Sequence, residues 1–221
     1  MTAPTLPAAP HTAHVREVAF FAADVPDMQT LIDGLRPGVA YHVLSPDGDG
    51  LAEIATHLAG YRDLDALHIV SHGAPGKVFL GGTILSEHTL PTPYAPALRG
   101  ALAGAGHLML YGCEVAKGAH GRNFIVRLES TLGRTVAASK TPTGAAEKVG
   151  DWALQTITGA VTSQALFATF AEYTGTLGSP TRGTIEFGSS KVDIAGPSVD
   201  PSVTDILSSG LDLNTSSSNN Q

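Results

Sequence analysis

The stretch ALHIVSHG, residues 66–73, reads as apolar up to Val70 and then ends in Ser, His and Gly. This pattern is typical of a central parallel strand that delivers polar side chains to the carboxyl edge of a sheet. The stretch HLMLYGC, residues 107–113, repeats the pattern and ends in Gly and Cys. Both stretches therefore predict strands of one parallel sheet.

Strand-like and helix-like stretches alternate on both sides of these two runs. Apolar residues recur at helical spacing in 28–35, 51–58 and 124–132, and a Pro-interrupted helical stretch precedes Gly106. Further strands are expected at 18–23, 41–44 and 135–138, with a small hairpin at 77–86. The alternation predicts an α/β fold, a three-layer sandwich with a mostly parallel central sheet and right-handed crossovers.

Composition divides the chain into three parts. Residues 1–14 are rich in Pro and Ala and are predicted to form a flexible N-terminal arm. Residues 15–177 carry the alternation and form the α/β domain. Residues 178–221 shift to Ser, Gly, Pro and Asn and form a C-terminal tail, in which TIEF and KVDIA indicate short edge-strand pairing.

Charge and cysteine content exclude several classes of protein. The 13 basic and 20 acidic residues give a net charge of −7, so we expect no nucleic-acid partner. A single cysteine forms no internal disulfide. The N-terminus lacks the pattern of a secretory signal peptide, and no stretch is long enough to span a membrane. A cytoplasmic location is the default expectation, with signal-independent export or surface assembly left open.

Two candidate catalytic residues follow the two central strands. His72 and Cys113 would emerge at the same sheet edge if these strands are neighbours. A nearby imidazole can hold or remove the thiol proton, so that the thiolate attacks a carbonyl carbon. The backbone N–H groups of Gly73 and Cys113 would face the developing oxyanion. Gly112, beside the cysteine, lets a substrate backbone approach closely.

Together, the two strand ends resemble a known fold. The pair SHG and YGC is similar to the caspase-haemoglobinase fold of cysteine peptidases, which includes caspases, metacaspases, gingipains, clostripain and separase. With HIVSHGAPG, YGCEVAKGAHG, VAAS…TG and GDWAL, the stretch from about residue 15 to residue 173 resembles a bacterial domain of unknown function from very large surface and adhesin-like proteins.

The resemblance implies a His–Cys dyad that cuts a peptide bond, with His72 as base and Cys113 as nucleophile. In such peptidases the substrate lies along the edge of the strand after the cysteine strand. That place corresponds to residues 135–140 and implies substrate contacts from Ala138, Ser139 and Lys140. The Gln-Ala-Cys signature of true caspases is absent, so a preference for Asp is not implied.

No metal or cofactor is expected. His68 lies four residues before His72, a separation of about 13 Å on a strand, which is too far for one ion. Residues 47–50, DGDG, lack the later ligands of a calcium loop and fit a turn and helix cap better. The Gly-Lys pair at 76–77 lacks the other residues of a phosphate-binding loop.

These observations lead to one principal hypothesis and two alternatives. The principal hypothesis is a cysteine endopeptidase that acts on a protein or peptide, either in self-processing or in maturation of a partner. In this case the tail, residues 178–221, could be a substrate segment, a linker, or a segment that docks on the sheet edge and blocks the groove. The first alternative is a catalytically silent module that binds an extended peptide, and the second is a structural part of a surface assembly.

Overall fold

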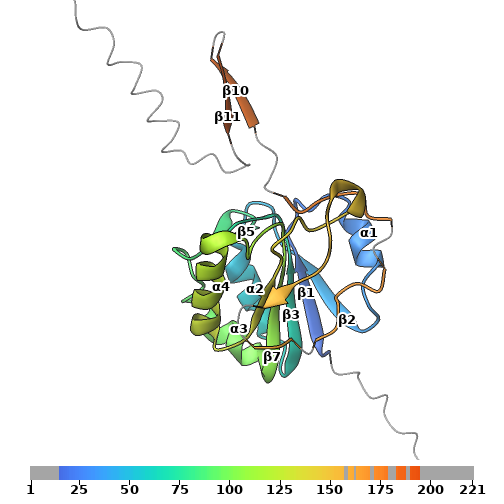
Figure 1. Cartoon of the computed structure of the whole chain (residues 1–221). Helices are drawn as coiled ribbons and strands as arrows, with labels where there is room; N and C mark the ends of the chain where they lie inside the picture. The colour runs from blue at the N-terminus through green and yellow to red at the C-terminus, as the bar shows by residue number, and fades with distance from the viewer. Residues whose placement is uncertain are drawn as a thin grey trace, which may run out of the picture.

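A six-stranded sheet forms the centre of the molecule (Figure 1). The computed structural model describes residues 15–156, 159–161, 163–169, 172–178, 183–187 and 190–194. In spatial order the strands are β2 (Val39–Val43), β1 (Glu17–Phe21), β3 (Leu64–Val70), β7 (Leu102–Tyr111), β8 (Val136–Ala138) and β9 (Gln155–Thr156). The first five are parallel, and β9 runs antiparallel to β8.

Three helices cover one face of this sheet: α2 (Gly50–Leu58), α3 (Ala95–Ala101) and α4 (Gly118–Leu132) (Figure 1). Their apolar residues recur every three or four positions, so they gather on one side of each helix and pack against the sheet. Alternate residues of β1 point to opposite faces of the sheet. Val18 and Phe20 belong to one apolar core, whereas Ala19 and Phe21 belong to a second apolar core.

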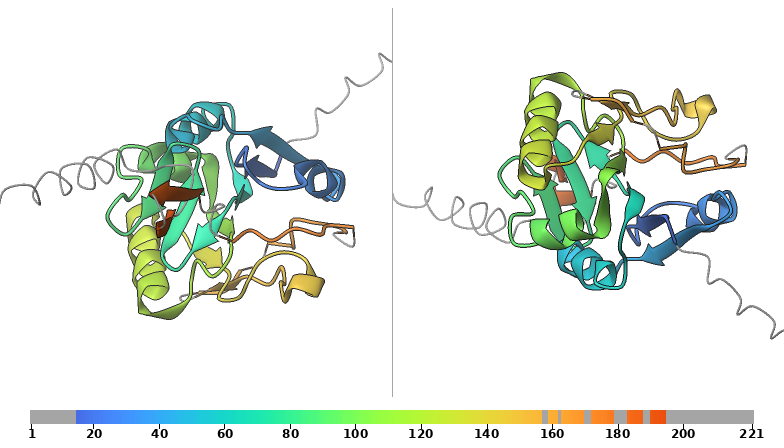
Figure 2. Two further views of the ribbon diagram at one scale, coloured as in Figure 1. Left: turned by 90° about the horizontal axis from the view of Figure 1, so that it is seen from above. Right: turned by 90° about the horizontal axis from the view of Figure 1, so that it is seen from below.

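The second face has little helical cover. It carries the short α1 (Met28–Asp33) and the segments that follow β8, which lie on the same side of the sheet as α1 (Figure 2). These segments include the 3₁₀ turn η1 (Ala146–Lys148) and the buried side chains of Leu166, Phe167, Tyr173 and Leu177. Helices, sheet and this second layer confirm the predicted three-layer α/β sandwich.

Two small sheets complete the described structure. One contains β4 (Gly73–Ala74), β5 (Lys77–Leu80) and β6 (Thr83–Ser86), of which β5 and β6 form the predicted hairpin. The other is an antiparallel hairpin of β10 (Gly183–Phe187) and β11 (Ser190–Ile194), which pair with each other. The predicted N-terminal arm and most of the predicted tail lie outside the described residues.

Three local features refine the predictions from sequence. β7 begins at Leu102, five residues before the predicted start, because α3 ends directly before it. Asp49 caps α2, and its carboxylate accepts hydrogen bonds from the N–H groups of Leu51 and Ala52 at 3.1 and 3.2 Å. The DGDG stretch is therefore a turn and helix cap, as expected. β9 was not predicted.

No helix within the described ranges is both long enough and apolar enough to cross a membrane.

Candidate active site

Parallel pairing brings the two predicted dyad residues to the same sheet edge. β3 and β7 are neighbours, and their register ends with Val70 opposite Tyr111. Two residues further along, His72 and Cys113 leave the sheet at its carboxyl edge. The apolar runs bury both strands, so their polar ends emerge together where the strands stop.

Two glycines let the ends of β3 and β7 approach one another. A Cβ on Gly73 would lie 2.8 Å from the carbonyl carbon of Gly112 and 2.9 Å from the nitrogen of Cys113. A Cβ on Gly112 would lie 3.2 Å from the Cα of Gly73. Any larger residue at Gly73 would therefore push the two backbones apart.

This close approach directs two backbone N–H groups to one oxygen atom. The N–H of Gly73 donates to the carbonyl oxygen of Leu177 at 3.0 Å, and the N–H of Cys113 donates to the same oxygen at 2.9 Å. They are the two groups that sequence analysis assigned to oxyanion binding. Two donors at such distances from one oxygen are the arrangement that stabilises a negatively charged tetrahedral intermediate.

Leu177 belongs to an extended segment of the chain that lies beside Cys113. Residues 173–178, here called the strap, run antiparallel to residues 143–145. The N–H of Leu177 donates to Thr143 at 2.8 Å, and the N–H of Ala145 donates to Gly175 at 2.9 Å. The strap therefore pairs through its backbone, as a bound peptide pairs with a sheet edge.

Thr143 holds the cysteine and the strap in place, and sequence analysis did not select it. Its N–H donates to the Cys113 sulfur at 3.0 Å, and its hydroxyl donates to the carbonyl of Gly112 at 3.1 Å. The Cys113 thiol in turn lies 3.4 Å from the Thr143 carbonyl oxygen, to which it donates. The only sequence signal for this role was the TG pair at 143–144 within the family-like motif.

The thiol of Cys113 is covered in this arrangement, with 7% of the residue exposed. Burial raises the pKa of Cys113 above its ordinary value of 9.0. Hydrogen bonds from the backbones of Thr143 and Leu177 act in the opposite direction, and the charge of Glu114 adds to the rise. The carboxylate of Glu114 bonds to Lys117, as an ion pair beside the site.

His72 contacts two backbone carbonyls. Its Nδ1 bonds to the carbonyl oxygen of Gly178, and its Nε2 lies 3.0 Å from the carbonyl oxygen of Asp24. Carbonyl oxygens only accept hydrogen bonds, so both contacts are satisfied together when both ring nitrogens carry a proton. Within the part of the chain that the structure describes, no hydrogen bond joins the His72 ring to the Cys113 sulfur.

The three residues predicted to contact substrate lie at the end of β8 and directly after it, where they contact other parts of this chain. Ala138 is fully buried and pairs with Gln155 of β9, so the edge of β8 is already occupied by this chain. Ser139 is buried, and its hydroxyl donates to Thr141 at 2.8 Å. The N–H of Lys140 donates to the Gln155 side chain at 2.9 Å. The extended segment whose carbonyl contacts the N–H of Cys113 pairs with residues 143–145.

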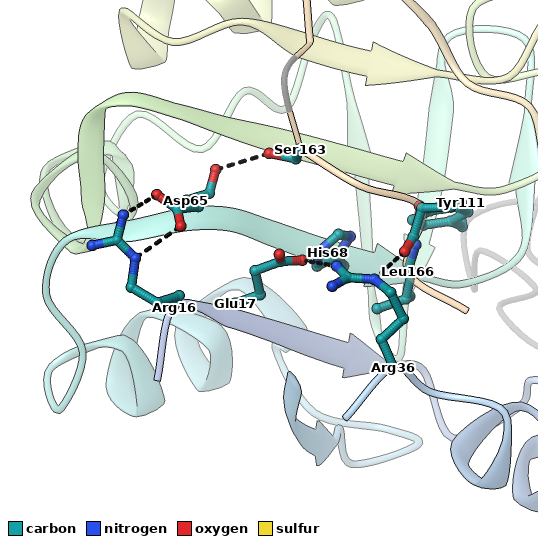
Figure 3. Close-up of polar contacts among 9 residues, drawn as sticks. Arg16, Glu17, Arg36, Asp65, His68, Tyr111, Ser163 and Leu166 are labelled. Atoms are coloured by element: carbon teal, nitrogen blue, oxygen red, sulfur yellow. Dashed lines mark hydrogen bonds and ion pairs between the residues drawn. The ribbon is translucent and has the colours of Figure 1, made fainter. Parts of the chain in front are cut away.

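A polar network attaches the second layer to the sheet (Figure 3). The carboxylate of Glu17 accepts hydrogen bonds from Arg36 and, at 2.9 Å, from Nε2 of His68. The N–H of Arg36 donates to the carbonyl of Leu166 at 3.1 Å, and the N–H of Leu166 donates to the hydroxyl of Tyr111 at 3.2 Å. His68 thus has a structural role in this network, whereas Leu166 belongs to the second layer, several residues before the strap.

Burial and hydrogen bonding set the charge states in this network. Burial lowers the pKa of His68, and the neutral ring still donates to Glu17. Burial alone would raise the pKa of Glu17, but hydrogen bonds from His68 and Arg36 lower it. Burial raises the pKa of Tyr111 to about 12, so its hydroxyl stays protonated.

Among the residues that the structure places, no group of three or more His, Cys, Asp or Glu side chains could hold a metal ion. A pocket of about 510 Å³ does lie beside the strap. It is lined by Tyr173 of the strap, by Trp152 and by backbone near Gly144 and Gly150.

Comparison with known families places the chain. Residues 18–177 match a family described as a domain of unknown function, DUF4347, and the chain belongs to this family. A search of curated proteins and a search of solved structures each returned no match. The matched region begins in β1 and ends at Leu177, so it contains His72, Cys113 and most of the strap.

Proposed function

We propose that this chain is a caspase-like cysteine endopeptidase, with Cys113 as nucleophile and His72 as the acid–base residue. The observation that carries the proposal is the convergence of two backbone N–H groups, from Gly73 and Cys113, on the carbonyl oxygen of an extended peptide segment. One of the two donors belongs to the residue that bears the thiol. A carbonyl held there lies beside a nucleophile and inside an oxyanion site.

The proposed reaction has two steps. His72 takes the thiol proton, the Cys113 thiolate attacks the carbonyl carbon, and the two N–H groups stabilise the oxyanion. The C–N bond then breaks, and His72 gives a proton to the leaving amine, which leaves a thioester on Cys113. Water attacks the thioester, releases the new carboxylate and restores the thiol. His72 contacts the carbonyl oxygen of Gly178, the residue after the one whose carbonyl the two N–H groups hold, and this position suits the general-acid role.

The substrate class is an extended segment of protein. Residues 143–145 offer backbone groups that pair with the strap, and backbone pairing recognises shape rather than sequence. Side-chain selection then depends on the pockets beside the strand. A protein or peptide partner, or this chain itself, meets these requirements.

A silent peptide-binding module is the second candidate, and the state of the thiol favours it. Cys113 is buried, its pKa is raised by that burial, and its sulfur bonds to Thr143 rather than to His72. A groove of this kind would bind an extended peptide with no chemistry. Reactivity of the thiol separates the two candidates.

The test is labelling of Cys113 by a peptide chloromethyl ketone, located by mass spectrometry. Because the strap covers the thiol, the comparison is made in the full chain carrying Leu177→Asp, in which a buried carboxylate disfavours the closed strap. We expect labelling of Cys113 that His72→Ala slows by about a hundredfold or more.

His88→Ala is the matched control, because the side chain of His88 is 82% exposed and belongs to the loop that follows β6. It should label at the rate of its parent. Equal labelling in the His72→Ala and His88→Ala proteins would contradict the peptidase and support the silent module.

A further inference from the structure

The strap occupies the site in the manner of a substrate. It pairs antiparallel with residues 143–145, and an isolated bridge joins Gly144 to Thr176. The backbones approach so closely here that a Cβ on Gly144 would lie 2.5 Å from the carbonyl oxygen of Gly175. The position of the strap is therefore set by backbone pairing on both sides of Thr176.

One carbonyl group of the strap has a distinct environment. The oxygen of Leu177 accepts both N–H groups of the oxyanion site, at 3.0 and 2.9 Å. The next carbonyl along the chain, that of Gly178, contacts His72 instead. The peptide bond between Leu177 and Gly178 thus has its carbonyl oxygen on the N–H groups of Gly73 and Cys113, and the residue on its amine side contacts the imidazole through its own carbonyl oxygen.

The side chain of Leu177 adds a second, independent observation. It is fully buried and belongs to an apolar cluster with residues such as Val70, Met109 and Phe167. A charged side chain in this place would lose its water without gaining a partner. The position before the reacting bond therefore selects an apolar side chain of about the size of Leu.

The position after the bond is open. Gly178 is partly exposed, and a Cβ built on it would meet no atom within 4 Å. The family match also ends at Leu177, so the residues that follow are not part of the matched domain.

From this geometry we infer that the site cleaves its own chain between Leu177 and Gly178 and releases residues 178–221. The inference rests on the proposed peptidase and names its substrate. The Cys113 thiol gives its proton to His72 and its sulfur bonds to the Leu177 carbonyl carbon. The C–N bond to Gly178 then breaks, and the Gly178 nitrogen takes that proton from His72. Hydrolysis of the thioester by water leaves a Leu177 carboxylate and a free thiol.

The experiment follows the mass of the purified full chain at neutral pH over several days. We expect two fragments, residues 1–177 and 178–221, formed at a rate that does not change with protein concentration because the reaction is intramolecular. Cys113→Ala should abolish the fragments. Leu177→Asp should reduce their formation by about a hundredfold or more, because the apolar pocket rejects the charge.

Two variants serve as matched controls. Leu177→Met conserves volume and apolar character, and Gly178→Ala adds a methyl group into open space, so both should still cleave. Thermal unfolding of every variant checks that the domain stays folded. Loss of cleavage in Gly178→Ala together with retention in Leu177→Asp would overturn the inference.

Failure of the inference and failure of the proposed function give different results. A chain that stays intact, or is cut at another bond, while Cys113 labels in a His72-dependent way, overturns the Leu177–Gly178 assignment and leaves the peptidase standing. An intact chain without His72-dependent labelling overturns both. Cleavage that accelerates with protein concentration overturns the intramolecular route.

Discussion

Replacing Gly73 with Ala tests whether the two strand ends form an oxyanion site. The N–H groups of Gly73 and Cys113 bond to the Leu177 oxygen at 3.0 and 2.9 Å. A Cβ on Gly73 would lie 2.7 Å from a methyl carbon of Val115, 2.8 Å from the carbonyl carbon of Gly112 and 2.9 Å from the nitrogen of Cys113. Two of these atoms are backbone atoms that support the site, so the methyl group must separate the strand ends.

The size of the effect follows from these distances. Ordinary contact begins at 3.4 Å, so each atom must retreat by about half an ångström or more. A shift of that size misaligns at least one donor, and loss of one oxyanion donor typically lowers the rate by about 10²–10³. Overpacking of this kind costs about 1–3 kcal/mol of unfolding free energy. We expect a folded protein that cleaves about a hundredfold more slowly, or slower still.

The assay is the time course of the 178–221 fragment, with thermal unfolding measured on the same samples. Gly104→Ala is the control, because a Cβ there meets no atom within 4 Å and the position lies in β7, away from its carboxyl end. It should cleave like the parent chain. A folded Gly73→Ala protein that cleaves at the parental rate would refute the assignment of these N–H groups.

Three further predictions concern stability and thiol reactivity. Burial lowers the pKa of His68 below 6.5 in the folded state. As the pH falls below 6.5, the unfolded state therefore takes up a proton first, and the unfolding free energy should decrease until the pH reaches the folded-state pKa. In urea denaturation, the unfolding free energy of His68→Gln should decrease less with falling pH than that of the parent chain. An equal decrease in both proteins would contradict this. Burial raises the pKa of Cys113, so iodoacetamide should alkylate the parent chain slowly at neutral pH and Leu177→Asp faster, whereas equal rates would mean that the strap does not cover the thiol. Asp49→Ala should lower the unfolding free energy by about 1 kcal/mol through loss of the helix cap, and a chemical denaturation curve identical to that of the parent would contradict that role.

Sequence was sufficient for the fold class because its signals are local. Apolar residues at helical spacing predicted α2 and α4, and continuous apolar runs predicted β3 and β7. The same runs end in polar residues and Gly, which placed His72 and Cys113 at one sheet edge. Each of these patterns can be recognised within a stretch of about ten residues, with no knowledge of what packs against it.

Tertiary structure decided what lies beside His72 and Cys113. The edge expected at 138–140 is covered by β9, and the strap at 173–178 pairs with 143–145 instead. These contacts use backbone N–H and carbonyl groups, which every residue except Pro offers alike, so no side-chain pattern marks them in advance. Residue identity therefore determined which groups could react, whereas long-range backbone pairing determined that the carbonyl held between Gly73 and Cys113 belongs to Leu177.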